Sequence, residues 1–318
     1  MSRIGVMFDC NRAPEELPEF AAACEAAGAD DLWVVEDLGW NGGISAAALA
    51  LAATTRLRVG IGIAPAPFRS PAVYAMEIAT LARVHPGRIV AGIGHGVGDW
   101  MRRIGNAPKS PLALLEESIV AIRDLLNGET VDVDGREVQL EGIKLVHPPR
   151  VVPPIVTGVV KPRSLELSGR VADGTILVEG LQPPQIAESL GHIRRGGGGD
   201  DHEIITFAFL HVEGDAAKAA AIRATALTGQ AGFLGVPVDE VFGLIGPASE
   251  VPAKVRTLEE SGADTIVLRP FGDDHLGQAQ AALKALGVLP REVGNAAGGR
   301  AVDGGVVAMV IVGVQESG

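Results

Sequence analysis

The sequence predicts an α/β protein, a (β/α)8 or TIM barrel with insertions. Short apolar, β-prone segments alternate with longer helical segments along residues 1–290. Eight such strands are each followed by helical sequence, which is the order of elements in this barrel. The strand segments are continuously apolar, as expected where a parallel sheet is buried on both faces. A doubly wound open sheet is the competing architecture, but it usually has fewer strands.

The first part of the chain contains four strands and four helices in alternation. Strands are predicted at Arg3–Phe8, Asp31–Glu36, Leu57–Ile63 and Arg88–Ile93. Helices are predicted at Pro14–Gly28, Ser45–Thr54, Pro71–Val84 and Pro111–Asn127. Proline near the start and glycine at the end bound several of these helices. Ser45 is expected to cap the second helix, because a serine side chain can accept a free N–H group of the first turn.

The second part begins with an interruption and then resumes the alternation. An Asp134-Gly135 pair between two β-prone runs predicts a hairpin at Thr130–Leu140, which we interpret as a surface insertion. Strands are then predicted at Pro154–Thr157, Gly174–Val178, Ile204–Val212 and Asp264–Leu268. Helices are predicted at Arg163–Val171, Pro184–Arg195, Asp215–Thr228, Ser249–Ser261 and Asp274–Leu286, with Ser249 as a cap. Residues 291–318 form a C-terminal tail, expected to be either disordered or an additional strand or subunit contact.

Composition and charge exclude several classes of protein. Hydrophobic residues make up 47% and charged residues 21%, which provides a large core and excludes general disorder. The net charge of −12 argues against a nucleic-acid partner. Two cysteines, Cys10 and Cys24, are too few for a disulfide framework, and no ligand spacing predicts a metal site. Without a signal peptide or an apolar run of membrane-spanning length, we expect a cytoplasmic protein with no membrane partner.

Glycine-rich turns follow two of the predicted strands, at the end where barrel enzymes place their sites. His95 lies among glycines at positions 92, 94, 96 and 98, and Thr157-Gly158 ends the fifth strand. Glycines let a backbone approach a ligand closely and present N–H groups to an anion. A tight turn is the alternative for each segment. Two such loops on neighbouring strands suit a phosphorylated planar cofactor better than either does alone.

Polar and aromatic residues also gather at the predicted strand ends. Glu36 and Asp37 are adjacent, so only one of them is expected to face the barrel mouth. They are interpreted either as a polar contact or proton-transfer group or as strand-end caps. His95 is a candidate proton donor or ligand contact, with a backbone-bonded loop histidine as the alternative. The candidates for an apolar substrate wall, which ordinary packing explains equally well, are Phe8, Trp40, Phe68 and Trp100.

Five ordered segments resemble the bacterial luciferase-like monooxygenase superfamily. They are LWVVEDLGW (32–40), residues 54–105, LLNGETVDVDG (125–135), residues 153–177 and ESGADTIVLRP (260–270). The chain is most similar to the branch that uses the deazaflavin coenzyme F420, the methylenetetrahydromethanopterin reductase-like enzymes. This resemblance implies a TIM barrel, often a homodimer, that transfers a hydride between F420 and a small organic substrate.

The resemblance also implies roles for particular residues. It places a non-prolyl cis peptide at Gly62-Ile63, followed by Ala64, behind the deazaflavin ring. It places Glu36 and Asp37 at the head of the cofactor, and these two with His95 are the catalytic candidates. The residues that it places along the ribityl phosphate tail are Gly94, His95, Gly96, Thr157, Gly158 and Val159.

Two other functions remain open. The first is an FMN-dependent luciferase-like monooxygenase, because FMN shares the tricyclic ring and ribityl chain of F420. A basic channel for the oligoglutamate tail of F420 would favour F420, and Arg69, Arg102 and Arg103 are candidates for it. The second is a cofactor-binding barrel without catalytic activity.

Overall fold

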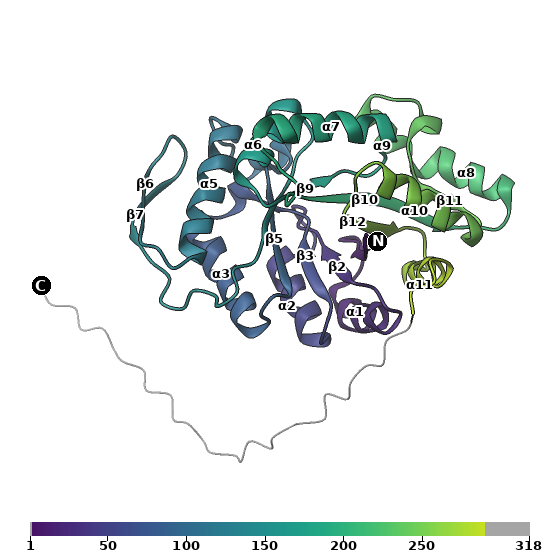
Figure 1. Ribbon diagram of the computed structural model, residues 1–318, viewed down its shortest axis with the longest axis horizontal. Coiled ribbons are helices and arrows are strands. Elements are labelled where there is room, and N and C mark those ends of the chain that lie inside the picture. Colours follow the sequence, from purple (N-terminus) through teal and green to yellow (C-terminus); the bar gives the residue numbers. More distant parts are fainter. Residues whose placement is uncertain (1, 290–318) are drawn as a thin grey trace, which may run out of the picture.

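Eight parallel strands close into a barrel in the computed structural model, which describes residues 2–289 (Figure 1). They are β1 (Arg3–Phe8), β2 (Asp31–Val34), β3 (Arg58–Ile61), β5 (Ile89–Gly94), β8 (Ile155–Gly158), β9 (Gly174–Leu177), β10 (Glu203–Val212) and β12 (Thr265–Pro270). Each strand pairs with the next in this order, and β12 pairs back with β1. The predicted barrel is therefore confirmed, while the tail expected at residues 291–318 lies outside the described residues.

Helices surround the barrel on its outer face (Figure 1). They are α1 (Leu17–Ala26), α2 (Gly43–Ala53), α3 (Pro71–Val84), α4 (Gly98–Arg103), α5 (Pro111–Leu126), α6 (Pro162–Val171), α7 (Pro183–Gly196), α8 (Ala216–Ala226), α9 (Thr228–Leu234), α10 (Val251–Glu260) and α11 (His275–Ala285). Short strands β4 (Ala64–Pro65) and β11 (Leu244–Gly246) extend the sheet beside β5 and β10. Among residues 2–289, no helix combines the length and apolar character needed to cross a membrane.

Both predicted serine caps are wrong. Helix α2 begins at Gly43, because the Glu36 carboxylate accepts the Gly43 N–H group and takes the place of a cap. Ser249 lies in a 3-10 turn, Ala248–Glu250, that precedes α10. The helix itself begins at Val251, where a proline in the second position favours a helix start.

The predicted hairpin is present and packs on the outside of the barrel. Strands β6 (Val131–Asp134) and β7 (Gln139–Ile143) pair antiparallel. The Glu117 carboxylate of α5 accepts the backbone N–H groups of residues 136–138 at 2.8 to 2.9 Å. One partly exposed carboxylate thus fixes the turn of the insertion to helix α5.

The barrel interior is filled by inward-facing side chains. They are Met7, Trp33, Val90, Val156, Ile176, Ile205, Phe207 and Val267. The Trp33 ring fills space left by glycines, since an added Cβ would lie 2.4 Å from it at Gly60 and 3.1 Å from it at Gly5 and Gly62. This packing closes the middle of the barrel.

An ion network closes the amino ends of the strands. Asp31 is fully buried, and Arg58 Nη2 donates to Asp31 Oδ2 and to Glu203 Oε1 at 2.6 Å each. These polar contacts have a structural role, because ligands bind at the opposite end of a TIM barrel. The pocket described next lies at that opposite end.

Candidate active site

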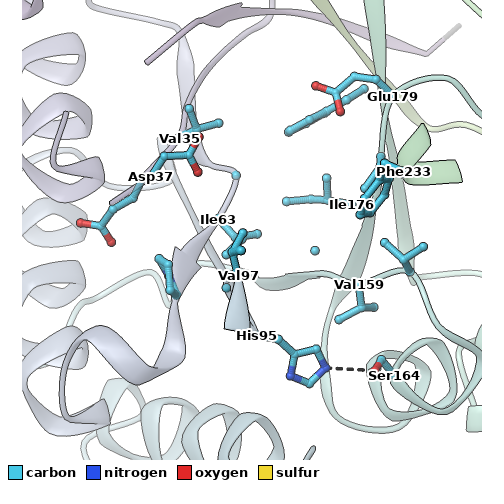
Figure 2. A pocket seen from close by; sticks show the side chains of 18 of the residues that line it. Val35, Asp37, Ile63, His95, Val97, Val159, Ser164, Ile176, Glu179 and Phe233 are labelled. Carbon is cyan, nitrogen blue, oxygen red and sulfur yellow. Dashed lines mark hydrogen bonds between the residues drawn. The ribbon is translucent and has the colours of Figure 1, made fainter. Parts of the chain in front are cut away.

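A pocket of about 450 Å³ opens at the carboxyl ends of the barrel strands (Figure 2). Ile63, Ile176 and Phe207 give it an apolar lower wall, and Val97 and Phe233 stand at its exposed rim. Polar side chains occupy separate parts of the lining. An apolar slot with a few convergent polar groups is the usual form of a cofactor or substrate site.

The peptide bond between Gly62 and Ile63 is cis, as expected from the family resemblance. The Ile63 side chain lines the pocket and fits against two glycines on neighbouring strands. An added Cβ would lie 2.7 Å from Ile63 Cγ2 at Gly158 and 3.0 Å from Ile63 Cδ1 at Gly94. These glycines therefore leave room for Ile63, and Gly94 lies beneath it rather than in the pocket lining.

Glu36 and Asp37 both line the pocket, so the expectation that only one would face it is wrong. β2 ends at Val34, and strand alternation no longer constrains the next residues. Glu36 Oε1 accepts from Arg69 Nη2 at 2.6 Å, while Glu36 Oε2 is buried without a hydrogen-bond partner among residues 2–289. Arg69 is thus an ion-pair partner of Glu36 and lies outside the pocket lining.

Sequence reasoning missed an ion network beside Asp37. Arg269, at the end of β12, donates Nε to Asp9 Oδ2 and Nη1 to Glu179 Oε1, each at 2.8 Å. Burial alone would lower the pKa of the Arg269 guanidinium, but the two carboxylates outweigh it and raise the pKa. Asp9 and Arg269 both stand at strand ends, which is the signal that could have identified them.

The same surroundings act on Asp37 and Cys10. Burial raises the pKa of Asp37, and the nearby Asp9 and Glu179 charges add to it, against a thiol hydrogen bond and Arg269. Burial and the two aspartates raise the pKa of the Cys10 thiol to about 12, so it stays protonated and donates to Asp37 Oδ2 at 3.4 Å. Asp37 consequently retains a proton at higher pH than an ordinary aspartate does.

His95 lies at the other end of the pocket, where its Nε2 pairs with Ser164 Oγ at 3.0 Å (Figure 2). Its Nδ1 is buried and makes no hydrogen bond within the described part of the chain. Burial lowers the pKa of His95, which favours the neutral ring. Lys161 lines the pocket as well, and Gly96 adopts a positive φ of 67°.

Helix α4, which was not among the predicted helices, begins at Gly98 directly after the glycine-rich loop. Its first N–H groups have no intrahelical acceptor, as in any helix. Lys161, Ser164 and the neutral His95 ring make this end of the pocket polar, and Lys161 is its positively charged side chain.

Three candidates point away from the pocket, because alternate residues of a strand face the helices. Phe8 packs edge-on against Phe20 of α1, with ring centroids 5.3 Å apart. Ala64 is buried in the core between strands and helices. The Thr157 hydroxyl donates to Ser168 Oγ of α6 at 2.6 Å. None of the three lines the pocket; Gly96, Gly158 and Val159 do.

The aromatic candidates divide in the same way. Trp100 lines the pocket, whereas Trp40 is 59% exposed on its loop and Phe68, in a 3-10 turn, lies outside the lining. Phe233 of α9 lines the rim, and sequence reasoning missed it because α9 was not predicted. Arg102 pairs with exposed Asp99 on the surface. Among residues 2–289, no cluster of three or more potential ligand side chains is arranged to hold a metal ion.

Comparison with known proteins gives consistent matches. Residues 2–265 match the family described as Luciferase-like monooxygenase. A 5,10-methylenetetrahydromethanopterin reductase of Methanolobus tindarius is 29% identical over 220 residues, which are 68% of this chain and 67% of that relative. An F420-dependent glucose-6-phosphate dehydrogenase of Mycobacterium avium (strain 104) is 34% identical over 187 residues, so the match spans 53% of this chain and 54% of the relative.

Solved structures show the same fold. An F420-dependent secondary alcohol dehydrogenase in complex with an F420-acetone adduct matches with a TM-score of 0.78 and 20% identity, covering 90% of this chain and 99% of that chain. The coenzyme F420 dependent tetrahydromethanopterin reductase from Methanopyrus kandleri matches with a TM-score of 0.75 and 18% identity, covering 90% and 98%. At these identities the likeness concerns the fold alone.

Proposed function

The chain belongs to the luciferase-like monooxygenase family, and from this premise we propose that it is an oxidoreductase that transfers a hydride between coenzyme F420 and a small organic substrate. The observation that carries the proposal is the pocket at the strand ends, which combines an apolar slot with a separate polar end that contains Lys161. F420 appears in the name of the glucose-6-phosphate dehydrogenase relative, which favours it over FMN.

The residues of the pocket fit a flat ring with a phosphate-bearing chain. Space for the ring depends on glycine, since a Cβ at Gly158 would force Ile63 out of its position. Two buried polar atoms in the lining, His95 Nδ1 and Glu36 Oε2, have no partner among residues 2–289. Such atoms are costly unless a ligand or water satisfies them.

In this proposal Gly62, Ile63 and Val159 hold the ring, and His95 and Gly96 hold the phosphate-bearing chain with Ser164 and Lys161 nearby. When bound, F420 supplies or accepts the hydride at its central ring carbon. The apolar rim excludes water from the reacting atoms.

Asp37 is the proposed proton-transfer residue. Its Oδ2 already accepts from Cys10, which leaves Oδ1 to exchange a proton with a substrate oxygen as the hydride moves. Because the pKa of Asp37 is raised, more of it is protonated at a given pH than of an ordinary aspartate. Glu36 is held by Arg69 and acts as a fixed polar contact.

Titration of the protein with F420 and, separately, with FMN tests this function through quenching of cofactor fluorescence. We expect saturable F420 binding with a Kd of about a micromolar and much weaker FMN binding. Asp37→Asn should retain F420 affinity and lower turnover by about a hundredfold or more, and Asp99→Asn on the exposed face of α4 serves as the matched control. Tight binding of FMN alone, or of neither cofactor, would refute the proposal.

The family resemblance also leads us to propose a homodimer. Apolar side chains are exposed on the neighbouring helices α2 and α3, namely Leu49, Val73 and Met76 at 44%, 44% and 57%. A group of exposed apolar side chains favours a protein contact. Light scattering in solution should give twice the chain mass, and the mass of one chain would contradict the proposal.

A further inference from the structure

We infer that the pocket takes an uncharged or cationic substrate, because Asp9 and Glu179 neutralise Arg269 and thereby exclude anionic substrates. The inference rests on the proposed function and names the substrate class of the same site. It concerns the end of the pocket where Glu179 lies, away from His95 and Ser164 (Figure 2).

Arg269 is the cation that lines this end of the pocket. A free arginine would bind a phosphate or carboxylate with two parallel N–H groups. Here Nε and Nη1 are already engaged by Asp9 and Glu179, and the guanidinium lies 5.5 Å from the centre of the Phe209 ring. Only Nη2 has no acceptor among residues 2–289, so an anion that binds two parallel N–H groups would have to displace a carboxylate.

Further carboxylates line the same end. Asp37 and Glu36 both belong to the lining, and Glu36 Oε2 has no partner among residues 2–289. Arg69 pairs with the other oxygen of Glu36, and its charge is shared with Glu77, whose Oε2 lies 3.7 Å from Arg69 Nε. Carboxylates thus outnumber guanidiniums around this space, so an anion meets repulsion at low dielectric.

A neutral hydroxyl or carbonyl group meets a different environment. Protonated Asp37 can donate to a carbonyl oxygen and its carboxylate can accept from a hydroxyl, so a neutral group requires no ion pair to break. The opposite end contains Lys161 and His95, where the anionic chain of the cofactor is proposed to lie. Exclusion of anions is therefore confined to the substrate end.

Binding of inorganic phosphate provides the test, because phosphate is the simplest anion that a free arginine would hold. Phosphate is titrated at constant ionic strength into the F420-saturated protein, in which the cofactor occupies the Lys161 end, and into the cofactor-free protein with Lys161→Gln. Intrinsic tryptophan fluorescence reports binding, since Trp100 lines the pocket. The variants are Glu179→Gln and Asp9→Asn, each also combined with Arg269→Gln, and Glu116→Gln on the exposed face of α5 is the charge-matched control.

We expect no saturable phosphate binding by the wild type or the control. Each carboxylate variant should gain binding at least about tenfold tighter than the wild-type limit, and Arg269→Gln should abolish the gain. Saturable wild-type binding that Arg269→Gln removes would overturn the inference, as would two folded variants that gain nothing. Circular dichroism establishes folding, and having two variants protects the test against failure of one. Absence of F420 binding would refute the proposed function, while the cofactor-free titration would still decide this inference.

Discussion

The ion pair between Arg69 and Glu36 connects the pocket to the segment that precedes helix α3. Its removal should lower the free energy of unfolding more than removal of a surface ion pair does. We predict that Arg69→Met destabilises the protein by about 3 kcal/mol, at the low end for a broken buried pair. The Glu36 side chain is 7% exposed and that of Arg69 is 19% exposed, with 2.6 Å between Arg69 Nη2 and Glu36 Oε1. After the change, the carboxylate keeps only the Gly43 N–H donor at 3.2 Å.

A double-mutant cycle isolates the interaction. The free energy of unfolding in urea is measured for the wild type, Glu36→Gln, Arg69→Met and the double variant. Arg69→Met leaves the Glu36 carboxylate without its ion-pair partner, and Glu36→Gln removes that charge. The double variant should therefore be about 2 kcal/mol more stable than the two single effects predict when they are added. The same cycle on Asp99 and Arg102, which pair at 3.1 Å with 62% and 68% of their side chains exposed, should give less than about 1 kcal/mol.

Equal coupling energies in the two cycles would refute this reasoning, because burial would then add nothing to the pair. The cycle also has a functional readout. Arg69→Met should weaken F420 binding more than the double variant does, since an unpaired Glu36 carboxylate can shift its position in the pocket lining.

Three other substitutions have defined outcomes. Gly158→Ala should weaken F420 binding about tenfold, since the added Cβ would push Ile63 into the pocket. The control Gly199→Ala, where an added Cβ would meet no atom within 4 Å, should leave F420 affinity unchanged. Equal F420 affinities of the two variants would contradict this prediction. Glu25→Gln should lower the free energy of unfolding by about 2 kcal/mol at neutral pH. The buried Glu25 carboxylate accepts three consecutive backbone N–H groups, at residues 55–57. Those bonds outweigh burial and lower the pKa of Glu25. The stabilisation is therefore present above the ordinary value of 4.5 and is lost as pH falls through the lowered pKa. The urea midpoints of the variant and the wild type should converge in acid, and a gap that stays constant with pH would refute this prediction. Glu117→Ala should increase amide hydrogen exchange at residues 131–143 and leave the barrel strands protected, and unchanged exchange in the hairpin would show that the carboxylate does not hold it.

The barrel could be predicted from the sequence because its signals are local. Each strand is a continuous apolar run, and α3 begins and ends at the predicted residues since Ser70 caps it and Pro71 occupies its first position. The direction in which the Phe8 side chain points could also have been predicted. Met7 points into the barrel, and alternation along β1 then turns Phe8 toward α1.

The ion pairs of the site could not be predicted in the same way. Arg269 meets Asp9, which is 260 positions away along the chain, and Glu179, which is 90 positions away. Only closure of the barrel brings β12 beside β1. Phe233 was missed for another reason, because α9 spans only Thr228–Leu234, contains two glycines and has little helical periodicity.

Trp33 and the glycines around it can be exchanged only together. Adding a methyl group at Gly60 would place it 2.4 Å from the indole, so that change is tolerated only after the tryptophan has been shortened. Shortening Trp33 first would leave a void under the pocket. Either order passes through a damaged intermediate, and single substitutions in a directed-evolution library will therefore fail at these positions. New specificities on this scaffold are accessible through the loops above, whose side chains can be exchanged one at a time.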